Sequence, residues 1–188
     1  MKNRKVRDLM TPEKEFVRIN EDLSVPESII ALKNAIKGYV EKNYLYDCVL
    51  VENSNGVVLG KISAVDIIKA LEPKYSRTGD SDVFSKKGVP HFGLSPEYVK
   101  TIVSRYNLWD ESLEDMVRHS SSLKASDIMY SPSDGGHVYE TSTIADAIHQ
   151  MALNHHTSVI VEKDDKITGV IRLMDIFKEV CNCVEKNK

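Results

Sequence analysis

Two short segments of the chain place a polar or basic side chain three residues before a carboxylate, at the end of an apolar run. Residues 60–66 have the sequence GKISAVD and residues 169–175 have the sequence GVIRLMD. The Ser63 hydroxyl can donate to a phosphate oxygen or a ribose, and the Asp66 carboxylate can accept from both ribose hydroxyls. The start of a helix also presents unpaired N–H groups that favour an anion. This corner therefore predicts a ribonucleotide site, with the sugar on Asp66 and the phosphate toward the helix.

A structural interpretation of the same residues stays open beside the binding one. Asp66 and Asp175 each fall in the first turn of a predicted helix, where a carboxylate complements the helix dipole. Ser63 suits the N-cap position, because its oxygen can accept from a backbone N–H of the first turn. Gly60 and Gly169 permit a close backbone approach under either interpretation.

The second segment departs from the first at one chemically important position. Arg172 stands where the first segment has Ser63. Arginine cannot act as a small hydroxyl cap, but its planar fork can hold a phosphate through two hydrogen bonds. The second site has therefore either lost nucleotide binding or prefers a ligand with more negative charge. The sequence is consistent with one functional site and equally with two.

The two segments belong to a longer internal repeat. Residues 6–11 (VRDLMT) match residues 125–130 (ASDIMY) at a separation of 119 positions, whereas residues 60–66 match their copy at 109 positions. Nine of the ten extra residues in the first copy fall around 36–47, between a helix and a strand, and one falls in the turn at 52–56. Length differences confined to connections indicate a duplicated fold, because loops tolerate insertion and packed elements do not.

Each copy is predicted to fold as strand, helix, strand, strand and helix. Apolar residues recur at helical spacing after Ser24 and Thr143, and continuous apolar runs suit strands buried on both faces. The predicted elements of the first copy are a strand at 16–19, a helix at 23–35, strands at 49–51 and 57–63, and a helix at 64–71. The predicted elements of the second copy are a strand at 137–139, a helix at 143–154, strands at 158–161 and 167–171, and a helix at 173–183.

The segment between the copies, residues 73–123, is not part of the repeat. Residues 74–93 are rich in serine, glycine and charged residues, which predicts an exposed loop. Two helices are expected to follow, one capped by Ser95 and one at 111–118 capped by Asp110. This helical hairpin either covers the chain's own core or docks on a partner protein. Its aromatic residues are Tyr98, Tyr106 and Trp109.

Composition and charge argue against several classes of function. The 188 residues carry a net charge of −3 with a pI near 6.1, so no basic face favours nucleic acid. No apolar run approaches the ~18 residues of a membrane span, and no apolar region follows the basic start as in a secretory signal. The three cysteines, Cys48, Cys181 and Cys183, lack the spacing of a zinc or redox site. We therefore expect the protein to reside in the reducing cytoplasm.

No pattern in the sequence predicts catalysis or a metal site. The chain lacks a nucleophile elbow, a P-loop and the glycine fingerprint of dinucleotide-binding folds. His155 and His156 are adjacent, but no carboxylate or thiol falls at a spacing that completes a metal site. We therefore expect no catalytic residue, no bound metal and no enzymatic activity.

The repeated unit resembles the CBS domain. The resemblance rests on the tandem β-α-β-β-α order and on the opening Asp-hydrophobic-Met segment. It also rests on the closing motif, which in the family reads Gly, two hydrophobic residues, Ser or Thr, any two residues and Asp. It covers residues 5–72 and 124–184 and leaves the insertion at 73–123 unexplained. The two copies are similar to a CBS pair, or Bateman module. This implies an α/β (α+β) fold in which the repeats pack about a pseudo-two-fold axis.

The resemblance also implies which residues surround a ligand. The adenine would lie between the strand after the opening segment and the loop before the buried strand, where backbone groups would recognise it. In site one this places Thr11, Val17, Arg18, Tyr46 and Asp47 beside Ser63 and Asp66. In site two it places His137, Val138, Thr157 and Ser158 beside Arg172 and Asp175. Both copies lack the proline that commonly precedes the buried strand, and the Asp47 carboxylate weakens the case for an anion in site one.

A CBS pair implies a stand-alone regulatory module and no enzyme. By resemblance, the ligand is an adenosine-containing molecule such as AMP, ADP, ATP or S-adenosylmethionine, and no cofactor is required. Two pairs are expected to stack as a homodimer into a flat disk, and ligand binding would shift the population of conformations. The alternative is a dimerisation or protein-interaction module with vestigial pockets.

Overall fold

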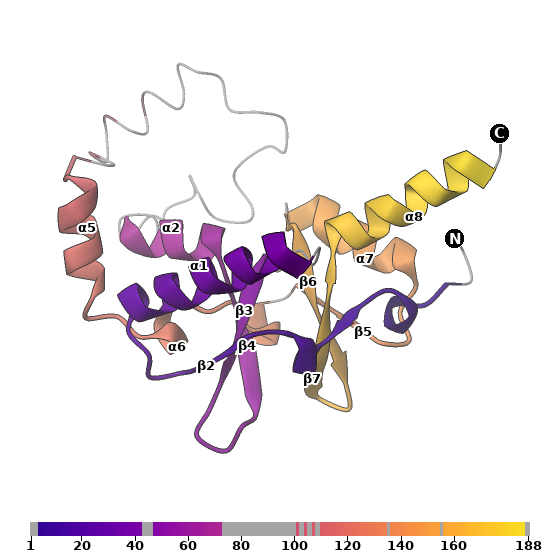
Figure 1. The fold of residues 1–188 in the computed structure, drawn as a ribbon, viewed down its shortest axis with the longest axis horizontal. Helices are drawn as coiled ribbons and strands as arrows, with labels where there is room; N and C mark the ends of the chain where they lie inside the picture. The colour runs from indigo at the N-terminus through magenta and orange to yellow at the C-terminus, as the bar shows by residue number, and fades with distance from the viewer. Residues whose placement is uncertain are drawn as a thin grey trace.

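The computed structural model describes residues 4–42, 47–72, 101, 104, 107, 110–134, 136–154 and 156–186 (Figure 1). Within these residues the predicted order of strand, helix, strand, strand and helix occurs twice. Repeat one consists of β2 (Arg18–Asn20), α1 (Val25–Lys42), β3 (Cys48–Glu52), β4 (Val58–Ser63) and α2 (Ala64–Leu71). Repeat two consists of β5 (His137–Tyr139), α7 (Ile144–Asn154), β6 (Ser158–Lys163), β7 (Lys166–Arg172) and α8 (Leu173–Lys186). The mixed α/β fold inferred from the sequence is therefore confirmed.

The two sheets share one strand topology. In each repeat the first strand runs parallel to the second, and the second runs antiparallel to the third. The pairing register shifts at equivalent places, between Val51 and Glu52 in β3 and between Val161 and Glu162 in β6. Bulges of this kind are conserved within protein families and are not random defects. The matching bulges support a duplicated fold independently of the sequence motifs.

The opening segment of each repeat pairs with the other repeat. The 3-10 helix η1 (Val6–Asp8) and the strand β1 (Thr11–Pro12) lie on repeat two, where β1 joins the edge of β7. In return, α6 (Ala125–Ile128) lies on repeat one, where the backbones of Tyr130 and Lys61 exchange hydrogen bonds of 2.8 and 2.9 Å. Figure 1 shows the start of the chain near α7 and α8, and α6 near α1. Two further 3-10 helices follow these segments, η2 (Glu13–Glu15) and η4 (Pro132–Asp134).

Two equivalent glycines make this exchange possible. A Cβ added at Gly60 would lie 2.5 Å from the carbonyl oxygen of Tyr130, and a Cβ added at Gly169 would lie 2.4 Å from that of Thr11. Both distances are far below van der Waals contact, so only glycine lets the crossing segment approach its strand. The close backbone approach predicted from the sequence is confirmed, and its partner is the opposite repeat.

Three apolar clusters form the core. The cluster beneath the helices of repeat two includes Val6, and the cluster beneath those of repeat one includes Ala125, so each core contains a residue from the other repeat's opening segment. The third cluster lies between the sheets and includes Leu50, Ile160 and Val170. Because all three clusters draw on both repeats, neither repeat completes its core alone.

Helix α1 is longer than the sequence pattern predicts. The apolar spacing suggested a helix ending near Ala35, but α1 continues to Lys42. Its counterpart α7 ends at Asn154, as predicted. Most of the extra residues in the first copy therefore extend the helix instead of forming a loop, because residues 36–42 contain no proline and the single glycine, Gly38, weakens a helix without ending it.

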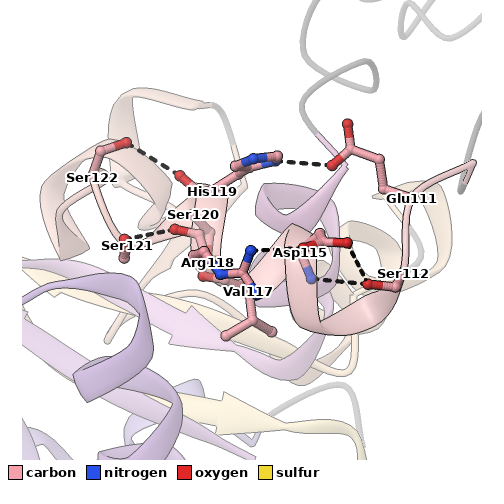
Figure 2. Close-up of polar contacts among 9 residues, drawn as sticks. All are labelled: Glu111, Ser112, Asp115, Val117, Arg118, His119, Ser120, Ser121 and Ser122. Atoms are coloured by element: carbon pink, nitrogen blue, oxygen red, sulfur yellow. Dashed lines mark hydrogen bonds and ion pairs between the residues drawn. The ribbon is translucent and has the colours of Figure 1, made fainter.

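Helix α5 (Leu113–Ser120) is the described part of the predicted hairpin, and its cap differs from the prediction. Ser112, and not Asp110, is the N-cap: its Oγ accepts from the Asp115 N–H at 3.2 Å and donates to the Asp115 carboxylate at 2.7 Å (Figure 2). Figure 2 also shows Arg118 and His119 paired with Asp115 and Glu111. The helix contacts α1 and α2, and its residue Met116 is buried. The predicted helix from Ser95 and the aromatic residues Tyr98, Tyr106 and Trp109 lie outside the described residues.

Candidate functional site

Ser63 and Asp66 of site one meet at the junction of β4 and α2. Ser63 ends the strand and caps the helix, and its N–H and hydroxyl both donate to Oδ2 of Asp66, at 2.8 and 2.6 Å. The capping interpretation of these residues is therefore realised. Both contacts fall on one carboxylate oxygen, and among the described residues none donates to Oδ1. The capping role thus leaves an acceptor that a ribose hydroxyl can use.

Site two holds a different pair at the equivalent junction of β7 and α8. Arg172 donates from Nε to Oδ2 of Asp175 at 2.6 Å and from Nη2 to Oδ1 at 2.8 Å. The two side chains are only 8% and 13% exposed. Burial acts to lower the pKa of Arg172, but the hydrogen bonds and charge of Asp175 outweigh it and raise that pKa. Both oxygens that would accept from a ribose are therefore engaged by the arginine.

The Tyr130 ring lies between the repeats, at the expected base position of site two and 5.6 Å from Nζ of Lys61 in the site-one motif. The tyrosine hydroxyl packs against Gly136, where an added Cβ would lie 2.1 Å away, and its ring meets that of His156 edge to face at 4.9 Å. Gly136 precedes β5 and His156 precedes β6, so the ring fills the gap in which the resemblance places adenine. The equivalent residue of the first opening segment is Thr11, which was expected in site one. It is small and buried, and it pairs with Val170 of β7, two positions before Arg172.

The loops before the two buried strands meet between the repeats. Thr157 donates from its hydroxyl to Oδ2 of Asp47 at 3.3 Å, and these residues occupy equivalent positions. Oδ1 of Asp47 is buried and has no hydrogen-bond partner among the described residues. Burial, and next the nearby Asp47 carboxylate, raise the pKa of the Cys48 thiol. The thiol therefore stays protonated at neutral pH and is a poor nucleophile.

The residues expected on the other wall of each site have varied surroundings. Arg18 pairs with Glu13 and Glu52, and its equivalent, His137, lies 3.3 Å from Glu162. Val17 is exposed, whereas the Val138 side chain is buried in the core of repeat two. Val138 is equivalent to Ile19 and not to Val17, because Arg18 and His137 pair with equivalent residues of β3 and β6. The wall residues expected in site two therefore lie one position further along than those expected in site one. Tyr46 lies outside the described residues.

Two residues near the sites were not singled out from the sequence. Tyr130 ends the second opening segment where the first has Thr11, so a comparison of the copies could have identified it. Lys61 lies within the site-one motif, but its burial depends on the opposing repeat. The lysine is 4% exposed and donates from Nζ to the Ser158 hydroxyl at 3.2 Å.

The described residues contain no group of three or more histidine, cysteine, aspartate or glutamate side chains placed to hold a metal ion. Of the two adjacent histidines, His156 contacts Tyr130 and His155 lies outside the described residues. In the described part of the chain, no helix has both the length and the apolar character needed to cross a membrane.

The comparisons with known proteins identify the family. The family model described as the CBS domain matches residues 6–73 and 125–182, which together make up more than half of the sequence. The chain therefore belongs to the CBS domain family, and its two repeats form a CBS pair. No curated protein matches the sequence.

Solved structures share the fold over nearly the whole chain. A CBS domain-containing protein of unknown function from Bacillus anthracis str. Ames Ancestor has a TM-score of 0.56 and 14% identity, covering 95% of this chain and 94% of that one. The protein CBSX2 in complex with AMP has a TM-score of 0.51 and 15% identity, covering 95% and 97%. An uncharacterized conserved protein from Pyrococcus horikoshii has a TM-score of 0.52 and 15% identity, covering 95% and 92%. Similarity at such low sequence identity shows the fold alone and does not identify the ligand.

Proposed function

We propose that this CBS pair is a non-catalytic regulatory module that binds one adenosine-containing ligand per chain, in site one. The observation that carries the proposal is the geometry of Asp66, whose Oδ1 receives no hydrogen bond from the described residues while Oδ2 holds the helix cap. A ribose hydroxyl can donate to Oδ1 without disturbing the cap. The phosphate or other 5′ group then lies near the positive end of α2.

In this proposal, site two is filled by the chain's own side chains. The Tyr130 ring lies where the base would bind, and Arg172 holds both oxygens of Asp175. Admitting a nucleotide would require the ring to leave and a buried ion pair to separate, which is costly when one charge is left without its partner. The alternative that site two prefers a more highly charged ligand is disfavoured, because the arginine fork already holds Asp175.

The ligand class is adenosine-containing, and AMP, ADP, ATP and S-adenosylmethionine are the candidates. The structure of CBSX2, which shares the fold, is a complex with AMP. Asp66 recognises the ribose that all four molecules share, so the phosphate side of the site must distinguish among them. No cofactor is needed, since binding itself is the function.

Ligand binding in site one would couple the two repeats. Asp66 belongs to repeat one, whereas Ser158, whose hydroxyl accepts a hydrogen bond from Lys61 of β4, belongs to repeat two. A ligand that touches both residues stabilises the arrangement in which they are close together, and it shifts the population toward that arrangement. A regulated protein would detect this shift in the relative position of the repeats.

A second copy of the chain is the expected partner, and the outer face of α8 suits it. The apolar residues on this face recur at spacings of four, three and four positions, the pattern by which two helices pack along a seam. They are Leu173, Phe177, Val180 and Val184, all of which are exposed in the single chain. Burying this face against another copy would remove its apolar side chains from water.

Calorimetric titration of nucleotide-free protein with AMP, ADP, ATP and S-adenosylmethionine tests the proposal. We expect saturable binding of at least one of them at one site per chain, and Asp66→Ala should weaken it at least tenfold. The matched control is Asp146→Ala. Asp146 accepts from the Thr143 N–H and hydroxyl at 2.8 and 2.9 Å, so this variant removes the same kind of helix cap away from both sites.

Three outcomes would contradict parts of the proposal. Two sites per chain would show that site two opens. Equal weakening by Asp66→Ala and Asp146→Ala would reduce Asp66 to a helix cap. If the folded protein binds none of the four compounds, the alternative of an interaction module with vestigial pockets is favoured, and the exposed face of α8 becomes its main surface.

A further inference from the structure

Lys61 is a buried cation with no acidic partner among the described residues. The residue is 4% exposed, its Nζ donates to the Ser158 hydroxyl at 3.2 Å, and it lies 5.6 Å from the centre of the Tyr130 ring. Within the part of the chain that the structure describes, no carboxylate lies within ion-pair distance of Nζ. An ammonium group has three donors, and burying its charge without a counter-ion is strongly unfavourable. The charge therefore points to an anion that binds there.

The position of Lys61 on β4 directs it to site one. Side chains alternate along a strand, so Lys61 and Ser63 lie on one face of β4, about 7 Å apart. Ile62, between them, packs into the helix-side core of repeat one. The face that carries Lys61 is turned toward repeat two, since its hydrogen-bond partner is Ser158. The lysine and the nucleotide motif thus share one side of the strand.

Comparison of the repeats shows that the fold itself does not require a cation here. The residue equivalent to Lys61 is Val170, which belongs to the apolar cluster between the sheets. Two positions later the chemistry is reversed, with Ser63 in repeat one and Arg172 in repeat two. Each repeat therefore carries one basic residue on this face. Arg172 has Asp175 as its counter-ion, whereas Lys61 has a neutral hydroxyl and a ring.

We propose that Lys61 is the anion anchor of site one, and that its ammonium group binds an anionic group at the 5′ end of the ligand while the ribose lies on Asp66. This inference rests on the proposed function of site one. The anion is either the phosphate of a nucleotide or the carboxylate of S-adenosylmethionine. The Ser158 hydroxyl accepts from Lys61, so its own hydrogen is available to the same anion. Site one would then take its sugar contact from repeat one and part of its anion contact from repeat two.

The test compares ligands with and without the anionic group on three proteins. The ligand pairs are AMP with adenosine, and S-adenosylmethionine with 5′-methylthioadenosine. The proteins are the wild type, Lys61→Val, which introduces the residue type found at the equivalent position 170, and Lys61→Arg, which keeps the charge. We expect Lys61→Val to lower the ratio of AMP affinity to adenosine affinity by about tenfold or more, the scale of a hydrogen bond to a charged group. Lys61→Arg should retain a larger share of that ratio than Lys61→Val.

The pair whose affinity ratio falls identifies the anion. A fall for AMP over adenosine assigns a phosphate, and a fall for S-adenosylmethionine over methylthioadenosine assigns a carboxylate. An unchanged ratio for both pairs overturns the inference. Failure of the wild-type protein to bind any of the four compounds is a different result, because it rejects the proposed function on which the inference rests.

Thermal unfolding separates the anchor from a structural lysine. If Lys61 is held for a ligand, Lys61→Val removes an uncompensated buried charge, and the melting temperature of the nucleotide-free protein should rise. A lower melting temperature, together with equal weakening of AMP and adenosine, would show that the lysine supports the fold and would overturn the inference. Should the valine variant not fold, Lys61→Met keeps the length of the side chain and is subjected to the same two measurements.

Discussion

The same substitution at the two equivalent aspartates should have opposite consequences. Asp175→Ala removes the carboxylate that holds Arg172 through two hydrogen bonds, and both side chains are largely buried. Removing one member of a buried ion pair leaves the other charge uncompensated and costs about 3–5 kcal/mol. Asp66→Ala removes only contacts at a helix start, for which the loss is about 1 kcal/mol. We therefore expect Asp175→Ala to be the more destabilising of the two by several-fold.

Urea and thermal unfolding measure this difference directly. For a chain of this length, 1 kcal/mol corresponds to a change in melting temperature of about 2–4 °C, so Asp175→Ala should lower it by roughly 6–20 °C and Asp66→Ala by only a few degrees. Calorimetry on the same proteins should show the reverse order. AMP affinity should fall for Asp66→Ala and stay close to the wild-type value for Asp175→Ala wherever the protein is folded.

A double variant checks the mechanism. Replacing Arg172 by methionine in the Asp175→Ala background removes the uncompensated charge and keeps an apolar stem, so at least part of the lost stability should return. If the double variant is as unstable as Asp175→Ala alone, the loss does not arise from a buried charge. If Asp66→Ala destabilises as much as Asp175→Ala, the proposed asymmetry between the two sites is wrong.

Two further predictions concern the exchange of opening segments and the expected dimer. Gly60→Ala should lower the free energy of unfolding by about 2–4 kcal/mol in urea titrations, because its Cβ would displace the Tyr130 backbone and break two hydrogen bonds. The control is Ser54→Ala, which lies in an exposed turn. Equal stability of the two variants would contradict the crossing geometry. Phe177→Glu should shift the chain from dimer to monomer in sedimentation experiments, because it places a charge on the exposed apolar face of α8. Lys178→Glu introduces the same side chain beside that face, and dissociation by both variants, or by neither, would argue against α8 as the interface.

Much of the fold could be predicted from the sequence because its determinants are local. Apolar periodicity, caps such as Ser63 and turn residues act within a few positions, and the chain carries each of these features twice. Alignment of one copy on the other is enough to locate the extra residues of the first copy and the departure at Arg172. The end of α1 does not follow from local pattern, because a helix without proline continues until tertiary contacts or a loop end it.

Local sequence pattern could not predict which opening segment pairs with which repeat. An opening segment such as residues 6–11 fits either repeat equally well, since the two strands that could receive it share the same glycine motif. Which one it joins depends on the reach of the chain and on the burial of Val6 in one core or the other. For the same reason, the position of the Tyr130 ring in site two does not follow from the sequence.

The sequence by itself determined the family, the order of elements and the presence of two similar corners with a carboxylate at each helix start, because these follow from local pattern and repetition. Only the tertiary structure decided how the corners differ. It left one oxygen of Asp66 without a donor among the described residues, engaged both oxygens of Asp175 with Arg172, and buried Lys61 against Ser158. The physical reason is that charge and hydrogen-bonding capacity depend on what lies opposite in space, and in this fold the opposite residue comes from the other repeat.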